Sequence, residues 1–332
     1  MYKRILSLAL SAGLIVTTQL AHAEANELRI AKQYGVSYLP MLIIEADKLV
    51  EKHAKAAGLG DIKVTWATFA GANVMNDALL SNSLDIASAG VPPAITLWDK
   101  TRGDVKLIAA MNSMPNLLNT RNPKIKSIRD FTDKDKIAVP AVKVGFQPVV
   151  LQMAALQTFG EGQQFKLDPL TVSLAHPDGL AALVSGVGEI TAHFTAPPFS
   201  QRELETQGIH TVLNSYDVLG GPATFNVLYG SRRFHDNNPK LYAAFLKAYE
   251  EATATINRDK RAAAQRYLEL SKDKDSVEDI YKIVSDPQVI FTTTPQNVTK
   301  FSDFLFKIGS IKQKPASWKD LFFPEIHALP GS

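Results

Sequence analysis

Glycines stand just before stretches with helical periodicity at Gly35, Gly71, Gly90 and Gly145. The N-terminus of a helix carries free N–H groups and a partial positive charge, and both favour an anion. Glycine also lets the backbone approach a ligand closely, because it has no Cβ. These positions predict a site that holds a small anion with backbone amides. The alternative for each glycine is a role in a turn alone.

Aromatic and amide side chains lie in the same segments and suit the walls of a ligand cleft. Tyr34, Tyr38 and Phe146 offer apolar surface, or belong to the core as their alternative. Asn73 and Gln147 offer hydrogen bonds that would orient a ligand. The predicted ligand-binding residues are Tyr34, Gly35, Tyr38, Gly71, Ala72, Asn73, Gly90, Val91, Gly145, Phe146, Gln147 and His193.

His193 follows an Ile-Thr-Ala run and precedes Phe-Thr-Ala-Pro-Pro. We therefore expect its side chain at the edge of a cleft rather than on a helix face, with a structural histidine as the alternative. His176, Asp178 and His193 carry metal-binding groups. They lie in separate loops, so their spacing along the chain gives no metal motif to test; we expect no metal, and convergence of the three on a metal ion is the alternative.

Motifs of common enzyme classes are missing from the 332 residues. The chain has no Gly-x-Ser-x-Gly, no Walker loop, no Gly-x-Gly-x-x-Gly after its first strand and no His-Glu-x-x-His. It also has no cysteine, which removes a thiol nucleophile, a cysteine metal site and a lipid-anchored cysteine. We expect a binding protein with no catalytic residue and no cofactor, and an enzyme is the main alternative class.

The first 23 residues have the layout of a secretory signal peptide. Lys3 and Arg4 precede an uncharged apolar stretch from Ile5 to Leu20, and the small-x-small site that ends at Ala23 follows. A membrane-spanning helix, the alternative, needs about 20 apolar residues. We predict cleavage after Ala23 and export to the periplasm.

The formal net charge of the chain is +3, and loss of Lys3 and Arg4 lowers it by two. No block of five or six basic residues occurs in the sequence. This balance argues against nucleic acid and against a charged membrane surface as partners. We expect a monomer whose ligand is a small molecule.

Strands of about five residues alternate with helices along the chain after Ala23, which is typical of an α/β domain with parallel strands. The first units are the strand Leu28–Lys32, the helix Pro40–Ala57, the strand Ile62–Phe69, the helix Asn73–Leu80, the strand Leu84–Ser88 and the helix Pro92–Lys100. Later strands are expected at Thr211–Leu213 and Thr224–Leu228. The last part is helical, at Leu241–Ile256, Arg261–Leu270, Val277–Val284 and Gln296–Ile308.

The order of motifs in the first units recurs later in the chain. Ile137-Ala138 and Pro148 repeat Ile30-Ala31 and Pro40, and the pair Pro197-Pro198 repeats Pro92-Pro93. Chance similarity between two helix–strand joints is the alternative. The repeat predicts two similar lobes, because each copy would form its own sheet.

The chain is expected to cross between the two predicted lobes twice. Residues 24–115 and 221–332 form lobe I, and residues 116–220 form lobe II. The segments Asn112–Asn122 and Tyr216–Ala223 join the lobes as a two-segment hinge, which permits closure around a ligand. Ligands of open parallel sheets bind at the carboxyl ends of the strands, so the glycine-containing loops face the cleft between the lobes.

At these residues the sequence resembles the periplasmic binding proteins of the nitrate, sulfonate, taurine and thiamine-precursor group. The motifs are the loop Gln33–Pro40, Asn76-Asp77-Ala78-Leu79, Asp85-Ile86-Ala87-Ser88 before Gly90 and Pro92-Pro93, and Ser317-Trp318-Lys319-Asp320 near the end. The resemblance implies an α/β, two-lobed, type II periplasmic-binding-protein fold. Each lobe would be a mixed sheet flanked by helices, and lobe I would be discontinuous.

The resemblance also implies the solute-binding component of an ABC importer that works with a permease and its ATPase. The ligand would be a small organic anion that is sulfonate-, taurine- or carboxylate-like. A thiamine-precursor pyrimidine or another neutral heterocycle is the alternative, and a sensor is an alternative of another class. Alkanesulfonate binders usually carry Gly-Asp where this chain has Ala89-Gly90, which puts the sulfonate in doubt.

Overall fold

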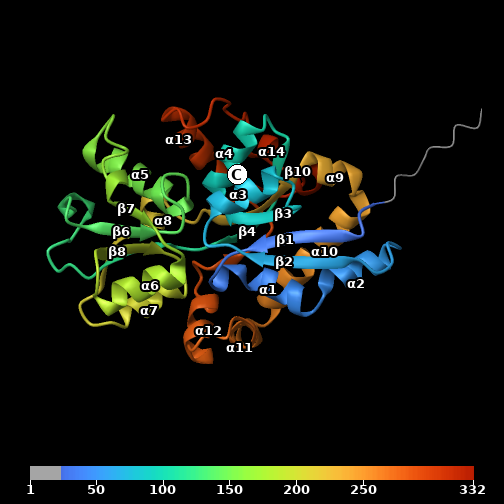
Figure 1. Cartoon of the computed structure of the whole chain (residues 1–332), viewed down its shortest axis with the longest axis horizontal. Helices are drawn as coiled ribbons and strands as arrows, with labels where there is room; N and C mark the ends of the chain where they lie inside the picture. The colour runs from blue at the N-terminus through green and yellow to red at the C-terminus, as the bar shows by residue number, and fades with distance from the viewer. Residues whose placement is uncertain (1–23) are drawn as a thin grey trace, which may run out of the picture.

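The computed structural model describes residues 24–332 as two α/β lobes that lie side by side along the long axis of the molecule (Figure 1). Each lobe has one mixed sheet with helices on both faces. The predicted signal peptide, residues 1–23, lies outside the described residues. In the described part, no helix is long and apolar enough to cross a membrane.

The first lobe contains a six-stranded sheet in the order β11-β4-β10-β3-β1-β2. β1 pairs in parallel with β2 and β3, whereas β10 runs antiparallel to β3 and β4. The strands span Glu27–Lys32 (β1), Lys63–Thr68 (β2), Ile86–Gly90 (β3), Val105–Ser113 (β4), Thr224–Ser231 (β10) and Ile290–Phe291 (β11).

The second lobe contains a five-stranded sheet in the order β7-β6-β8-β5-β9. β6 pairs in parallel with β7 and β8, and β5 runs antiparallel to β8 and β9. The strands span Leu117–Thr120 (β5), Lys136–Val139 (β6), Thr171–Ser173 (β7), Ile190–Thr195 (β8) and His210–Asn214 (β9).

The two sheets share one topology. The run β2-β1-β3-β10-β4 corresponds to β7-β6-β8-β5-β9, with parallel and antiparallel pairs at the same places. In both sheets the strand that is antiparallel to both of its neighbours in this run, β10 or β5, is the first strand after the chain crosses over from the other lobe. The repeat predicted from the sequence is therefore present in the fold.

Helices cover both faces of each sheet (Figure 1). In the first lobe, α1, α2 and α10 pack together on one face, and α3, α4 and α13 on the other; in the second lobe, α5 packs with α8 and α6 with α7. The helices span Leu39–Ala46 (α1), Leu49–Ala56 (α2), Ala72–Leu80 (α3), Val91–Lys100 (α4), Phe146–Phe159 (α5), His176–Ser185 (α6), Phe199–Leu204 (α7), Ser215–Leu219 (α8), Arg232–Asn237 (α9), Pro239–Arg258 (α10), Lys260–Ser271 (α11), Val277–Ser285 (α12), Val298–Lys307 (α13) and Trp318–Leu321 (α14). Short 3₁₀ helices span Val36–Tyr38, Ile128–Asp130, Asp168–Leu170 and Pro324–Ile326.

Two sequence-based expectations differ from the structure. The helix expected over Pro40–Ala57 is divided into α1 and α2, because Lys48 adopts the left-handed conformation with φ 49°. Both predicted hinge segments contain regular structure, since Leu117–Thr120 forms β5 and Ser215–Leu219 forms α8. The chain passes between the sheets only at residues 114–116 and 220–223.

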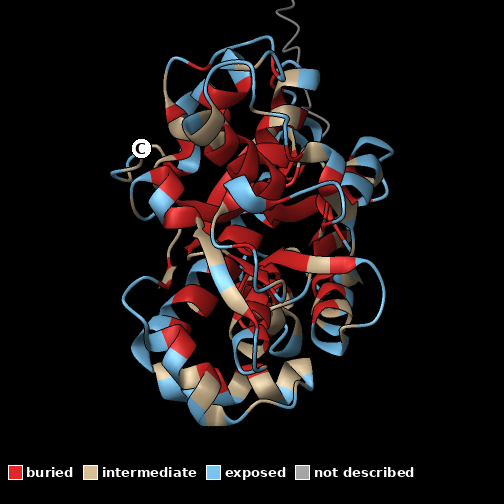
Figure 2. Cartoon of the chain, turned by 90° about the vertical axis from the view of Figure 1, so that its left-hand side faces the viewer, coloured by how far each residue is buried: buried red, intermediate tan, exposed pale blue. Residues whose placement is uncertain are grey.

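Buried residues lie in the interior of both lobes, and exposed residues lie on the outer helices and loops (Figure 2). β3 is buried at every position, and β8 at every position but one. Central strands of a sheet that has helices on both faces are buried on both sides. The core therefore fixes the ends of these strands, and with them the loops that face the other lobe.

Candidate functional site

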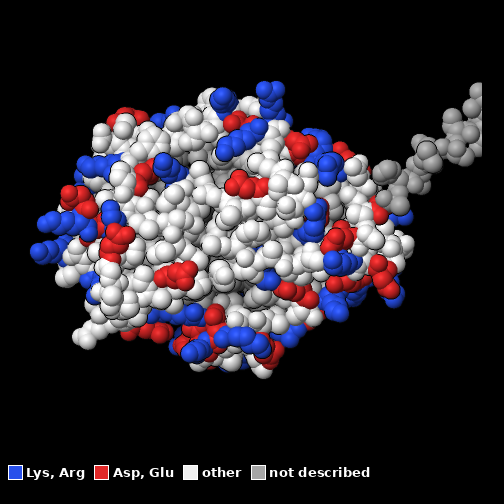
Figure 3. Space-filling view, in the orientation of Figure 1, with Lys and Arg blue, Asp and Glu red and all other residues white. Residues whose placement is uncertain are grey.

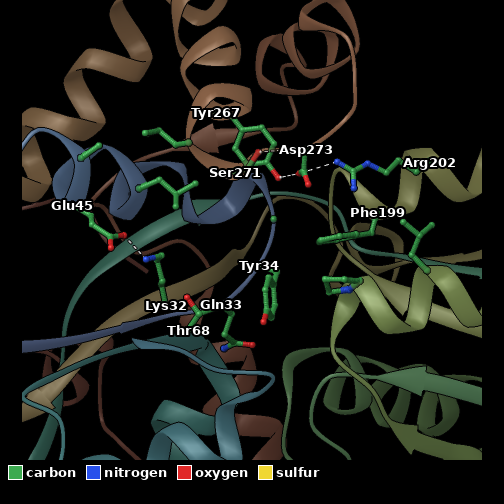
Figure 4. Close-up of a pocket in the computed structure, with 16 residues that line it drawn as sticks. Lys32, Gln33, Tyr34, Glu45, Thr68, Phe199, Arg202, Tyr267, Ser271 and Asp273 are labelled. Carbon is green, nitrogen blue, oxygen red and sulfur yellow. Dashed lines mark hydrogen bonds and ion pairs between the residues drawn. The ribbon is translucent and has the colours of Figure 1, made fainter. Parts of the chain in front are cut away.

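A cavity of about 550 Å³ lies between the lobes (Figure 4). The first lobe lines it with the end of β1, the following loop, α1 and α11, and the second lobe with α6 and α7. Tyr34 and Phe199 reach it from opposite lobes, and Tyr267 closes one side. The walls are therefore largely apolar and aromatic, as in many small-molecule sites.

The charged groups of this cavity are already paired. Lys32 forms an ion pair with Glu45, and its ammonium group lies 5.1 Å from the centre of the Trp66 ring. Arg202 on α7 pairs with Asp273, which lies just after α11. Each cation in the wall thus has a carboxylate partner, and the wall has no excess of either charge.

Arg202 also ties the lobes together. Its Nη2 atom lies 2.8 Å from Asp273 Oδ2, and its Nε atom donates to Asp275 Oδ1 at 2.8 Å. These hydrogen bonds to carboxylates raise the pKa of Arg202 although its partial burial opposes the charge. We call Arg202, Asp273 and Asp275 the inter-lobe bridge. It connects α7 with the α11–α12 loop, and its members Arg202 and Asp273 line the cavity (Figure 4).

A second, much smaller cavity of about 20 Å³ lies deeper between the lobes. Gln33 and Tyr34 line both cavities, so the small one adjoins the large one. Its size suits about one water molecule or one small polar group. Of the predicted ligand-binding residues, it is lined by Tyr34, Tyr38, Ala72, Gly90, Gly145, Phe146 and Gln147. We call the cavity of about 550 Å³ the outer cavity and the cavity of about 20 Å³ the inner cavity.

Three of the four predicted glycines stand at the N-termini of α-helices, since Gly71, Gly90 and Gly145 directly precede α3, α4 and α5. Gly35 precedes the 3₁₀ helix Val36–Tyr38 and lines the outer cavity. Gly35, Gly71 and Gly90 meet the opposite lobe. A Cβ at Gly71 would overlap the carbonyl oxygen of Pro140, and one at Gly90 would lie 2.8 Å from Phe146 Cβ. These glycines let the lobes approach closely, because no side chain separates the two backbones.

His193 does not lie at the cleft edge, so that expectation is wrong. Its side chain is fully buried in the second lobe and lines neither cavity. β8 is a central strand with both faces covered, so a side chain near its end points into the lobe.

His193 belongs to a buried chain of polar side chains. Its Nδ1 atom lies 2.5 Å from Glu203 Oε1, and Asn119 Nδ2 donates to Glu203 Oε2 at 2.9 Å. On the other side, its Nε2 atom lies 3.4 Å from Nδ1 of His176, which also lies 2.7 Å from the Thr195 hydroxyl. Burial raises the pKa of Glu203 to about 8 and lowers that of His193 to about 3.

Sequence reasoning left several lining residues unassigned. His176 lines the inner cavity from the start of α6. It follows a strand and begins a helix, like the residues predicted to bind ligand, so its position in the sequence could have identified it. Arg202, Tyr267 and Asp273 carry no local signal, because they meet only through tertiary packing. Of the remaining predicted residues, Asn73 is exposed and Val91 is buried in the core, and neither lines these cavities.

Solved structures with the same two-lobed architecture bind small solutes. The alkanesulfonate-binding protein SsuA from Xanthomonas axonopodis pv. citri matches with a TM-score of 0.70 and 15% identity, over 91% of this chain and 99% of that one. The aliphatic sulphonate-binding protein SsuA from Escherichia coli matches with a TM-score of 0.65 and 18% identity, over 90% of this chain and 92% of that one. The nitrate-binding protein NrtA from Synechocystis PCC 6803 matches with a TM-score of 0.64 and 16% identity, over 90% of this chain and 84% of that one.

These likenesses confirm the two-lobed periplasmic-binding-protein fold, with a mixed sheet flanked by helices in each lobe. Residues 21–270 match the model of the NMT1-like family. The chain therefore belongs to the NMT1-like family. No curated protein matches the sequence significantly.

Proposed function

We propose that the protein is the solute-binding component of an ABC importer and captures a small organic molecule between its lobes. The observation that carries this proposal is the outer cavity, which both lobes line and which Arg202 and Asp273 of the inter-lobe bridge border. A ligand that contacts both lobes favours the closed arrangement over an open one. The sulfonate- and nitrate-binding proteins that share the fold support the same role.

The ligand that suits the outer cavity best carries a planar ring. Tyr34 and Phe199 offer aromatic faces or edges from the two lobes, and a ring between them would gain both contacts. An anion would compete with Glu45 and Asp273 for the two cations in the wall. We therefore favour a neutral heterocycle. A sulfonate- or carboxylate-like anion is the second candidate, since the proteins named above bind such ligands or nitrate.

We further propose export to the periplasm after cleavage at Ala23, where the protein would act as a monomer. Its partners would be the importer's permease and ATPase, and no catalysis is proposed. Acidic and basic side chains are intermingled on the face shown in Figure 3. Such a surface has no single-sign patch of the kind that nucleic acid requires.

Thermal-shift screening of the purified protein tests this proposal. The panel contains neutral nitrogen heterocycles, sulfonates, carboxylates, phosphates and nitrate. A ligand at 100 times its dissociation constant adds about 2.7 kcal/mol to the free energy of unfolding, so the melting temperature rises. We expect a heterocycle to give the largest rise.

The variant Phe199→Ala locates the binding site, because it removes an aromatic wall of the outer cavity. The stabilisation by the best compound should be lost in Phe199→Ala and kept in Phe165→Ala, whose ring is exposed and lines neither cavity. Equal stabilisation of both variants would place the ligand elsewhere and overturn the proposal.

A further inference from the structure

We propose that the inner cavity is a subsite for a hydrogen-bond-accepting group of the ligand, and that His176 donates to this group through its Nε2 atom. The inference rests on the proposed function, because it concerns the polar end of the same ligand. It assigns a specificity role to a histidine and to the two buried residues behind it.

The first observation is the free side of the His176 ring. Only 6% of the residue is exposed, yet it lines the inner cavity. Its Nδ1 atom faces Thr195 and His193, whereas no hydrogen bond to Nε2 occurs within residues 24–332. Nε2 is also absent from the fully enclosed polar atoms that lack a partner. Nε2 is therefore the ring nitrogen without a partner among the described residues, and the proposal places it toward the inner cavity, which His176 lines.

The second observation is the pair behind His176. A carboxylate oxygen and an imidazole nitrogen at 2.5 Å must share a proton, and one proton keeps this buried pair neutral overall. Asn119 Nδ2 donates to the other carboxyl oxygen, so the shared proton lies on the side of His193 Nδ1. Whichever partner holds it more tightly, His193 carries a second proton at Nε2, since a neutral imidazole with Nδ1 as acceptor is protonated there.

The third step assigns the proton of the neutral His176 ring to one of its two nitrogens. His193 Nε2 lies 3.4 Å from His176 Nδ1, its one side-chain hydrogen-bond partner within the described chain, so the proposal has the N–H of His193 Nε2 donate to this atom. His176 Nδ1 must then be unprotonated, and the Thr195 hydroxyl can donate to it as well. A neutral imidazole with an unprotonated Nδ1 carries its proton on Nε2. Glu203 and His193 thus make His176 a donor toward the inner cavity and act as positioning residues.

The ring of His176 is also held in place. It stacks on Phe199, with ring centres 5.4 Å apart and planes 19° apart. Phe199 lines the outer cavity, so one aromatic side chain contacts the proposed ring site and supports the proposed donor. A ligand ring in the outer cavity would therefore direct an acceptor atom at its inner end toward His176.

Nitrogen NMR of histidine-labelled protein tests the proton assignment without a ligand. We expect His176 to carry its proton on Nε2 at neutral pH. The same result is expected for Glu203→Gln, because the glutamine amide donates to His193 Nδ1 and its oxygen accepts from Asn119. A proton on Nδ1 of His176 in the wild-type protein would overturn the inference.

Pyridine and benzene serve as the binding probes, because they share ring size and differ in one acceptor atom. We expect pyridine, but not benzene, to shift the His176 Nε2 signal. His176→Met should weaken pyridine binding about tenfold, or roughly 1.4 kcal/mol, which is within the range of one hydrogen bond. His176→Gln keeps a donor near the same point and should retain most of the affinity.

Lack of pyridine binding to the wild-type protein, or equal binding by His176→Met, would overturn the subsite. Failure of the proposed function is distinguishable from this result. A screening hit that requires Phe199 but is indifferent to His176→Met would leave a solute-binding protein without this subsite.

Discussion

Glu203 is fully enclosed, and within the described residues its ion-pair partner is His193. The folded pair holds one proton between the pKa values of about 3 for His193 and about 8 for Glu203. In the unfolded chain the ordinary values are 6.5 and 4.5, so above pH 6.5 the unfolded pair has lost both protons. Folding therefore retains a proton between pH 6.5 and 8.

The free energy of unfolding should accordingly fall as pH rises from 6.5 to 8, by up to about 1.4 kcal/mol per pH unit. His176 does not contribute in this window, because burial lowers its pKa well below 6.5 and it is neutral in both states. Urea unfolding at several pH values measures the slope. Glu203→Gln, which cannot titrate, should remove this component. The same slope in the variant would mean that the pair does not hold the proton.

His193 also shows how far the position of a single side chain can be predicted from the sequence. The apolar run before His193 identifies a strand correctly, and an exposed position at its end was a reasonable expectation. Burial depends on the strands on either side, and β8 lies between β6 and β5. That neighbour relation is set by contacts between distant segments, so the orientation of His193 could not be predicted locally.

At the level of elements, α11 and α12 extend from the first lobe toward the second (Figure 1). Their connecting loop supplies Asp273 and Asp275 to Arg202 on α7. The side chain of Arg202 is 19% exposed, so water screens these interactions only in part. The inter-lobe bridge should therefore favour the closed arrangement of the lobes.

Arg202→Gln should weaken binding of the best screening compound about tenfold, or roughly 1.4 kcal/mol, because closure loses charge-assisted hydrogen bonds. Isothermal titration calorimetry measures the change. The control is Arg261→Gln, which removes an exposed ion pair to Glu278 between α11 and α12 within one lobe. An equal loss of affinity in both variants would exclude a specific role for the bridge.

Periodicity predicted most elements of the strand–helix repeat within a few residues. It worked because strands such as β1 and β3 and helices such as α4 carry their own turn and proline signals. β4 was missed, and β5 was taken as part of a hinge. The contact between α7 and the loop after α11 also lacked any sequence signal, because Arg202 and Asp273 are far apart in the chain.

At the scale of the whole molecule, two lobes whose sheets share one topology lie on either side of a cavity. Glycines occupy positions where the backbones of the two lobes come into contact. The shared strand order places corresponding loops of both lobes at the interface. Gly71 against Pro140 is the tightest such contact, because a Cβ would overlap the carbonyl oxygen. Full closure of the lobes therefore requires glycine at this position.

The most direct test of closure on a ligand is small-angle X-ray scattering with and without the best screening compound. We predict that the compound lowers the radius of gyration of the wild-type protein. Gly71→Ala should fold normally, because Gly71 has an extended backbone that alanine also adopts, but it should stay more open. Asp77→Ala, an exposed change on the same helix α3, should behave like the wild type. An unchanged radius on ligand addition, or equal compaction of Gly71→Ala, would contradict capture by closure of the two lobes.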